Sequence, residues 1–415
     1  MRQPAFPVAP PLAVRDHWLL DPAIAFLNHG SFGACPRPVL DAQSRFREQM
    51  EREPVRFFTR ELEPLLDGVL SALAAFLGAD PEELALVPNA TAGVNTVLRS
   101  LELGPGDELL TTDHAYNACR NALDDAARRA GARVVVAPVP FPVKTADEVI
   151  EAVLRATSPR TRFALIDHVT SPTGLVLPVA PVVAALSRRG VEVLVDGAHA
   201  PGMVPLDVHA LGAAYYTGNC HKWMCAPKGA AFLHVERSRR HRIRPLVISH
   251  GANATRQDRS RFRLEFDWTG TFDPTPFLCI PEAIRFMASL GPGGGGWSAL
   301  MKHNRAMAMA ARAIMATKLG CALPCPEEML GALAALPLPP RRDAVEEGAL
   351  IDPLQTALLE TYGVEVPIVP WPAPSGRLVR ISAQIYNQQQ EYERLIDALE
   401  RLLRGAGSSE SVRSQ

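Results

Sequence analysis

Short apolar runs alternate with amphipathic segments between residues 84 and 235. The amphipathic segments, such as TAGVNTVLRSLEL and PVAPVVAALSRRG, have apolar residues at helical spacing. The runs between them are continuous and apolar, which is typical of strands buried on both faces of a sheet. This alternation predicts βαβ units and a mostly parallel sheet. The predicted strands are 84–88, 108–112, 133–138, 162–168, 191–196 and 229–235.

The C-terminal part of the chain has a longer helical pattern. Helices are predicted at 274–290, around 297–318 and 351–362, and over QQEYERLIDALERLLRG, with one strand at 377–382. The arginine-rich stretch 236–263 has no strong pattern, and we expect it to be a surface connection. The expected parts are an N-terminal arm (1–30), a large domain (31–285), a smaller α/β domain (286–404) and a disordered tail (405–415).

The composition is that of an ordinary globular protein, since 47% of the 415 residues are hydrophobic and 21% are charged. A formal net charge of -1 gives no support for a nucleic acid or an anionic membrane as a partner. We find no export signal and no run of the roughly 18 apolar residues that a membrane span needs. Seven scattered cysteines, an odd number, suit a reducing compartment. We therefore expect a soluble, cytoplasmic protein.

One lysine and one aspartate are candidates for the chemistry of pyridoxal phosphate (PLP). Only five of the 43 basic residues are lysines, and Lys222 lies in the apolar turn TGNCHKWMCAPKG, between His221 and Trp223. Asp196 ends the apolar strand VEVLVD, so its carboxylate would project into the crevice at the carboxyl ends of the strands. A lysine amine can form a Schiff base with PLP, and a carboxylate can keep the pyridine nitrogen protonated.

Each of these residues also has an ordinary interpretation. Most lysines are solvated, and an aspartate after a strand is often only the cap of the next helix. The separation of Asp196 from Lys222 by one helix and one strand favours the functional interpretation. His199 would contact the cofactor ring or its phenolic oxygen, or would be a plain loop histidine.

A helix start after the first predicted strand is the candidate phosphate site. The sequence VPNATAGVN ends a strand and opens a helix at Asn89, so free backbone N–H groups would face the crevice. The phosphate would contact Ala90 and Thr91. The same residues form a helix cap in any case.

Eight segments in the same order resemble the class V aminotransferase family of fold type I PLP enzymes, and most closely its isopenicillin N epimerase-like branch. The resemblance covers about residues 20–390. The segments are FLNHGSFGACP (26–36), NATAGVN (89–95), TTDHAYNACRNAL (111–123), DHVTSPTGLVLPV (167–179), VDGAHAPG (195–202), GNCHKWMCAPKGAAFL (218–233), WTGT (268–271) and RISAQIYN (380–387).

The resemblance implies a seven-stranded type of sheet flanked by helices, and it assigns roles to residues that match the family's motifs. Lys222 matches the Schiff-base lysine, Asp196 the carboxylate at the pyridine nitrogen, and Thr91 a phosphate ligand. Either His114 or Tyr116 would stack on the ring face opposite the lysine, and the sequence does not decide between them. The neighbouring His221 is included among the cofactor-binding candidates.

The resemblance also implies contacts with the substrate and with a second subunit. Arg380 matches the arginine that binds the substrate carboxylate, for which a planar bidentate donor is well suited. Asn28 and His29 match a loop that covers the site. Ser171 stands where related cysteine desulfurases have an asparagine near the phenolic oxygen, which leaves that contact open. Gly270 and Thr271 resemble a segment that reaches the phosphate of the neighbouring subunit, implying a homodimer with shared sites.

Three reactions at the α-carbon of an amino acid remain open: epimerisation, C–S lysis by β-elimination, and transamination. Epimerisation needs a proton donor on the face opposite Lys222, and His114 or Tyr116 could serve. The family branch contains both epimerases and C–S lyases. Cysteine desulfurase chemistry is disfavoured, because RISAQIYN lacks the mobile cysteine nucleophile.

Other classes of protein are disfavoured. A non-catalytic PLP-binding regulator usually carries a DNA-binding module, for which this N-terminus is too short, and a PLP-free α/β protein would be colourless. The run GPGGGG (291–296) follows a helical pattern, so a hinge is favoured over a dinucleotide site. Cys220 and Cys225 flank Lys222 without a second ligand pair, so no metal is expected. The sequence does not identify the substrate's side chain.

Overall fold

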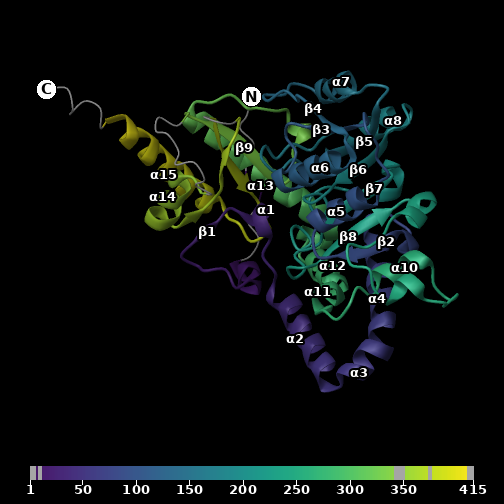
Figure 1. Cartoon of the computed structure of the whole chain (residues 1–415). Coiled ribbons are helices and arrows are strands. Elements are labelled where there is room, and N and C mark those ends of the chain that lie inside the picture. The colour runs from purple at the N-terminus through teal and green to yellow at the C-terminus, as the bar shows by residue number, and fades with distance from the viewer. Residues whose placement is uncertain (1–5, 8–11, 341–350, 373–375, 409–415) are drawn as a thin grey trace.

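A seven-stranded sheet forms the centre of the protein in the computed structural model, which describes residues 6–7, 12–340, 351–372 and 376–408. The strand order is β2-β8-β7-β6-β5-β3-β4, and among these described strands β8 alone runs in the direction opposite to the others (Figure 1). The strands are β2 (Leu84–Val87), β3 (Glu108–Thr112), β4 (Arg133–Ala137), β5 (Thr161–Asp167), β6 (Glu192–Asp196), β7 (Tyr215–Asn219) and β8 (Ala231–Val235). The six predicted strands are confirmed, and β7 is the strand expected between Asp196 and Lys222.

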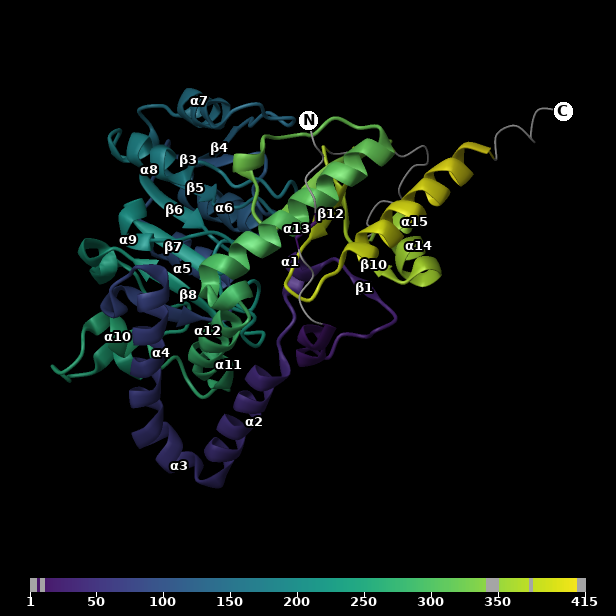
Figure 2. The ribbon, with the colours of Figure 1, turned by 180° about the vertical axis from the view of Figure 1, so that it is seen from behind.

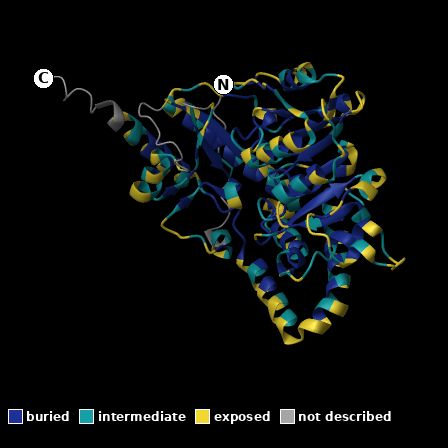
Figure 3. Cartoon of the chain, in the orientation of Figure 1, coloured by how far each residue is buried: buried dark blue, intermediate teal, exposed yellow. Residues whose placement is uncertain are grey.

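Helices cover both faces of this sheet, which explains why its strands are continuous apolar runs. Two apolar cores lie on opposite faces, and Figure 3 shows the strands buried between them. One core is closed by α5 (Ala90–Ser100), α6 (Asn117–Ala130) and α10 (Arg261–Phe266). The other is closed mainly by α4 (Leu62–Leu77), α7 (Ala146–Ala156) and α8 (Val179–Ser187). The short α9 (Val208–Leu211) connects β6 to β7.

The stretch 236–263 is more ordered than the sequence pattern indicated. It contains 3-10 helices at Arg237–Arg242 and His250–Asn253 and the start of α10. Arg263 is buried and donates to Asp67 on α4 at 2.7 Å and to Asp267 at 3.1 Å. The expectation of a plain surface connection was therefore incomplete, because ion pairs between segments far apart in sequence hold this stretch in place.

Helices before β2 form a projecting, V-shaped hairpin (Figure 1). It consists of α2 (Arg37–Arg52), α3 (Pro54–Arg56), a π-helical turn at Phe57–Glu61, and α4. Short elements precede and follow the hairpin. They are the 3-10 helix Leu12–His17, β1 (Ala25–Phe26), α1 (His29–Phe32) and the 3-10 helix Pro81–Glu83.

A smaller antiparallel sheet, of order β11-β12-β9, lies beside the large one. The long α13 (Gly296–Leu319) runs along it (Figure 2), and β1 pairs with β10 of this region, which joins the N-terminal segment to it. The predicted helix 274–290 is two helices, α11 (Thr275–Leu278) and α12 (Ile280–Ser289), with prolines in the first turn of each. The remaining elements are the 3-10 helices Pro292–Gly294 and Glu327–Met329, β9 (Leu333–Leu338), α14 (Pro353–Tyr362), β10 (Val364–Glu365), β11 (Ile368–Pro370), β12 (Arg377–Ser382) and α15 (Gln389–Ser408).

The expected fold class is confirmed: an α/β protein with a mostly parallel central sheet flanked by helices and a smaller C-terminal α/β region. The domain boundaries at 30, 285 and 404 stay predictions. The helix α15 extends to Ser408, into the predicted tail, and residues 409–415 lie outside the described residues. None of the helices in the described residues combines the length and the apolar content that crossing a membrane requires.

Candidate active site

Lys222 lies in the turn between β7 and β8, at the carboxyl end of the parallel strands. Its Nζ is 3.1 Å from Nε2 of His199, and its side chain is half-buried. Burial, with the nearby charge of Arg380, lowers the pKa of Lys222 to about 8, while Asp196 acts in the opposite direction. A neutral amine is therefore accessible at mildly alkaline pH, as nucleophilic attack on an aldehyde requires.

The hydrogen bonds of His199 favour the neutral amine. The indole N–H of Trp223 donates to Nδ1 of His199 at 3.4 Å, which assigns the ring proton of a neutral imidazole to Nε2. Burial holds the pKa of His199 well below its ordinary value, so the imidazole is neutral. Nε2–H then points at Nζ of Lys222, and only an unprotonated amine has a lone pair to accept it.

Asp196 ends β6 and is buried. Its Oδ1 accepts the N–H of Ala198 at 3.0 Å, and its Oδ2 accepts the thiol of Cys119 at 3.2 Å. Burial raises the pKa of Asp196, and the two hydrogen bonds and Lys222 counteract this effect. The Asp196 carboxylate and the Lys222 amine are therefore near enough for each to act on the pKa of the other.

A second buried carboxylate, Asp167, lies beside Asp196 and was missed from the sequence. Asp167 ends β5, and the two aspartates are paired in register across the parallel strands. Burial and the neighbouring charge of Asp196 raise the pKa of Asp167 well above its ordinary value. The signal was available, because RFALIDH also ends an apolar run on an aspartate.

The start of α5 is oriented by polar contacts. Asn89 caps the helix by accepting the N–H of Ala92 at 2.8 Å, and Asn219 at the end of β7 accepts the N–H of Ala90 at 2.8 Å. The N–H of Ala90 is thus already bound within the protein. Thr91 is next along the helix, and its hydroxyl lies within hydrogen-bonding reach of the Cys119 thiol. Asn219 was not identified from the sequence.

Arg380 on β12 is buried, and its guanidinium is held from both ends. Its Nη1 donates to the carbonyl of Ser171 and, at 3.2 Å, to the Ser171 hydroxyl, while Nη2 donates to the hydroxyl of Ser31 at 3.0 Å. Its Nε has no partner among the described residues, and burial lowers the pKa of Arg380 to about 10. A buried cation with an unused donor is suited to an anionic ligand such as a carboxylate. Ser171 is thus part of the arginine's support.

His114 and Tyr116 have different environments. His114 is buried, with Nδ1 bound to the Thr173 hydroxyl at 2.8 Å and Nε2 to the carbonyl of Val139 at 3.1 Å. Tyr116 precedes α6, is 45% exposed, and lies close enough to Arg380 for the two groups to interact electrostatically. Of the two, Tyr116 has its polar group available on the side of Arg380.

The two predicted loop residues near the N-terminus, Asn28 and His29, are hydrogen-bonded to other parts of the chain. His29 is buried and contacts the carbonyl of Lys222 at 3.1 Å and the hydroxyl of Tyr386 at 2.7 Å. Asn28 donates to Glu365 at 2.9 Å. A side chain at Gly33 would collide with the carbonyl of His221, so this segment can approach the lysine turn only with glycine there.

Three other predicted site residues are His221, Gly270 and Thr271. The Nδ1 of His221 contacts the carbonyl of Ala230 at 3.0 Å, so this ring braces the lysine turn. Gly270 and Thr271 lie in the loop between α10 and α11, and no hydrogen bond within the described residues joins them to Lys222, Asp196 or Arg380. Their expected role needs a second subunit.

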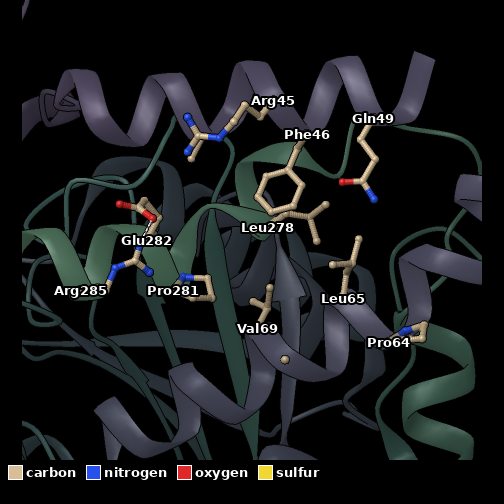
Figure 4. Close-up of a pocket in the computed structure, with 12 residues that line it drawn as sticks. Arg45, Phe46, Gln49, Pro64, Leu65, Val69, Leu278, Pro281, Glu282 and Arg285 are labelled. Carbon is tan, nitrogen blue, oxygen red and sulfur yellow. Dashed lines mark hydrogen bonds and ion pairs between the residues drawn. The ribbon is translucent and has the colours of Figure 1, made fainter. Parts of the chain in front are cut away.

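A surface cleft of about 570 Å³ between α2, α4 and α12 lies elsewhere (Figure 4). Phe46, Leu65, Val69 and Leu278 line its apolar part, and Arg45 and Arg285 lie at its edge. None of the predicted site residues lines this cleft. The groups with the chemistry for a cofactor are those around Lys222, namely His199, Asp196 and Arg380.

The residues of this crevice fit PLP. The cofactor's aldehyde needs an amine that can be neutral, its ring nitrogen needs an acid, and its phosphate needs N–H and hydroxyl donors. Lys222, Asp196 and the start of α5 supply these groups. Arg380 adds a cation for the carboxylate of an amino acid.

Comparison with known proteins agrees with this arrangement. The family model described as aminotransferase class-V matches residues 33–395. Isopenicillin N epimerase of Streptomyces clavuligerus is 36% identical over 402 residues, which cover 94% of this chain and 97% of that protein. A probable chloroplastic L-cysteine desulfhydrase of Arabidopsis thaliana is 32% identical, over 92% of this chain and 84% of that protein. The cysteine desulfurase CsdA of Escherichia coli has the same fold, with a TM-score of 0.75, 19% identity and coverage of 96% and 99%.

The low pKa of Lys222 predicts a pH dependence. The neutral amine is the reactive form and is present above the pKa, so the rate of colour formation when PLP is added to the apoprotein should rise as pH rises through about 8. His199→Ala removes the N–H that favours the neutral amine, and should move this midpoint upward by roughly one pH unit. Stopped-flow absorbance measures both.

His250→Ala changes an exposed histidine and is the matched control; its midpoint should equal that of the wild type. A wild-type midpoint near the ordinary lysine value of 10.5 would contradict the proposed environment of the amine.

Proposed function

The chain belongs to the aminotransferase class-V family of PLP-dependent enzymes, and on that basis we propose that it inverts the α-carbon of an amino acid, as an epimerase or racemase. The observation that carries the proposal is the 36% identity to an isopenicillin N epimerase over nearly the full length of both chains. The buried amine, acid and arginine of the crevice are consistent with it. The side chain of the substrate is left open.

We assign the cofactor contacts as follows. Lys222 binds the aldehyde, Asp196 holds the ring nitrogen, and Thr91 with the start of α5 holds the phosphate. His199 lies beside the amine, where it orients Nζ and favours its neutral form. Bound PLP supplies an electron sink that makes the proton on the α-carbon of an attached amino acid acidic. Lys222 is the base that takes this proton on one face.

Arg380 is the proposed anchor of the substrate carboxylate. Ser31 and Ser171 hold its two Nη groups, so the plane of the guanidinium is fixed before the substrate binds. The Nε has no hydrogen-bond partner within the described residues, so one donor of the guanidinium is unused. Anchoring the carboxylate orients the α-carbon relative to Nζ of Lys222.

Inversion needs a second proton donor on the opposite face, and Tyr116 is the better candidate. Both ring nitrogens of His114 are used by Thr173 and Val139, so His114 could donate only by breaking a buried hydrogen bond. Tyr116 is partly exposed and close to Arg380, which would bind the substrate.

C–S lysis is the second candidate, favoured by the 32% identity to the L-cysteine desulfhydrase. It would use the same amine, acid and arginine, with an acid that assists the sulfur leaving group. All seven cysteines are free thiols, but six are buried and only Cys321 is half-buried, which gives no support for a cysteine nucleophile.

We also propose a homodimer in the cytoplasm. Leu246, Val247 and Ile248 form an exposed apolar run, of which Leu246 and Val247 line an apolar hollow shared with Thr269, next to Gly270 and Thr271. A second copy covering this run would bring the 270–271 loop towards the partner's phosphate. The seven free thiols suit a reducing compartment.

The reaction is tested by incubating the holoenzyme with L-amino acids and cysteine conjugates in deuterated water. Inversion with deuterium at the α-carbon, followed by NMR and chiral chromatography, is expected. Tyr116→Phe should slow inversion by roughly 10²–10⁴-fold, the usual contribution of a positioned acid. Exchange of the α-proton for deuterium by Lys222, on its own face of the substrate, should continue. Pyruvate release without inversion would instead establish the lyase, and keto-acid formation a transaminase.

Lys222→Ala should remove the visible absorbance that the wild type shows with PLP, and with it the activity. The physical reason is that Lys222 carries the amine that contacts His199 and lies near Asp196. Absorbance spectra and the deuterium assay check this. Lys302→Ala, which changes an exposed lysine on α13, is the control and should keep both properties. If the Lys222 variant kept both, the cofactor assignment would fail.

Arg380→Ala should weaken substrate binding far more than cofactor binding, because the guanidinium faces the substrate. An increase in KM of roughly 10²-fold or more is expected for loss of a charge-assisted contact. Arg380→Lys keeps the charge but loses the planar fork, and should recover only part of the loss. Equal losses in PLP affinity and substrate affinity would argue against the carboxylate role.

Val247→Glu should weaken the dimer, since the substitution would bury a charge in the proposed interface. Sedimentation velocity at several concentrations measures the change in dissociation constant. Leu323→Glu changes another exposed apolar residue outside the proposed interface and should leave association unchanged. A wild type that stays monomeric at all concentrations would contradict the shared-site proposal.

A further inference from the structure

Cys119 on α6 lies between two residues that we assign to the cofactor. Its Sγ donates to Oδ2 of Asp196 at 3.2 Å, and the hydroxyl of Thr91 lies within hydrogen-bonding reach of the same sulfur. The side chain is 1% exposed. The thiol therefore hydrogen-bonds to the proposed ring-nitrogen acid on β6 and lies near the start of α5, where the phosphate would bind.

The charge of Asp196 is set by groups from several elements. Asp167 on β5 is a neighbouring acid, Tyr216 on β7 is close enough for its pKa to be raised by Asp196, and Lys222 is the nearby cation. Burial disfavours the carboxylate form, and this effect is opposed by Lys222 and by two hydrogen-bond donors, the N–H of Ala198 and the thiol of Cys119. Cys119 is the only side-chain hydrogen-bond donor to Asp196 among the described residues.

We propose that Cys119 is a positioning residue that keeps Asp196 ionised and holds it at a fixed distance from the phosphate end of the site. The proposal rests on the proposed function, because it concerns how the chain prepares its own carboxylate for the cofactor's ring nitrogen. It adds a residue, Cys119, that contacts Asp196 and does not contact the cofactor itself.

A buried thiol can also be a small apolar filler of the core, and the other cysteines show that alternative. Cys279 is fully buried in the large core, and no hydrogen bond of its thiol is found within the described residues. Cys119 differs because its sulfur faces a carboxylate oxygen at hydrogen-bonding distance. A thiol that only fills space could be replaced by alanine without changing the proton affinity of Asp196. Replacing a thiol that donates a hydrogen bond to Asp196 would change that affinity.

The test uses pyridoxine 5′-phosphate, which has the ring nitrogen and phosphate of the cofactor but no aldehyde, so Lys222 cannot capture it. Its binding to the apoprotein is measured by calorimetry across acid and neutral pH. Binding needs the ionised carboxylate, so affinity should fall as pH falls through the pKa of Asp196. Loss of the thiol raises that pKa, so Cys119→Ala should lose affinity at a higher pH.

A shift of about one pH unit is expected for one weak donor to a buried charge, which makes binding roughly tenfold weaker on the acid side. Cys119→Ser restores a donor and should return the pH profile to that of the wild type or to lower pH. Cys279→Ala removes a buried thiol that makes no hydrogen bond to a carboxylate within the described residues, and its profile should not move.

Two results would overturn the inference alone: an unshifted profile in Cys119→Ala, or the same upward shift in both Cys119 variants. Should Cys119→Ala fail to fold, as judged by thermal melting, the serine profile decides, because an upward shift there contradicts the role of a donor. If the wild type does not bind pyridoxine 5′-phosphate at any pH, the proposed function fails, and the inference fails with it.

Discussion

Removal of Lys222 and Asp196 from water is the constraint on which the site depends. The two groups lie at the carboxyl ends of parallel strands whose faces are covered by helices, so Asp196 is buried and Lys222 is half-buried. Burial disfavours the charged form of each, lowering the pKa of Lys222 and raising that of Asp196. The hydrogen bonds around them then decide which form is held: His199 favours a neutral amine, and the donors to Asp196 favour a charged acid.

The smaller C-terminal region and the N-terminal segment complete this crevice from one side. Arg380 comes from β12, and Ser31, which holds it, comes from the segment around α1. His29 of the same segment contacts the carbonyl of Lys222 and the hydroxyl of Tyr386. Lys222 and Arg380, which are far apart in sequence, are therefore linked through one short N-terminal segment.

The family relationship and the geometry answer different questions. Similarity to isopenicillin N epimerase and to cysteine desulfhydrase identifies the cofactor chemistry, but it is compatible with two reactions, inversion at the α-carbon and C–S lysis. The geometry distinguishes the acid–base groups, since His114 is enclosed by hydrogen bonds and Tyr116 is not. A partly exposed tyrosine near Arg380 is consistent with the proposed inversion, which needs proton donors on two faces.

The sequence alone determined most of the central sheet, because a strand buried on both faces must be continuously apolar, and a polar residue at its carboxyl end must face the crevice. That rule identified Asp196 and the turn that carries Lys222, and it could have identified Asp167. It did not identify α2 to α4 or α10, and the ion pair of Arg263 with Asp67 joins α10 to α4 across a long sequence separation.

Only the tertiary structure decided which side chains meet. The contact of Cys119 with Asp196, that of Ser31 with Arg380, and the enclosure of His114 by Val139 join segments that no local pattern relates. Hydrophobic periodicity records which face of an element is buried, but the partner of a buried polar group depends on how the elements pack against one another.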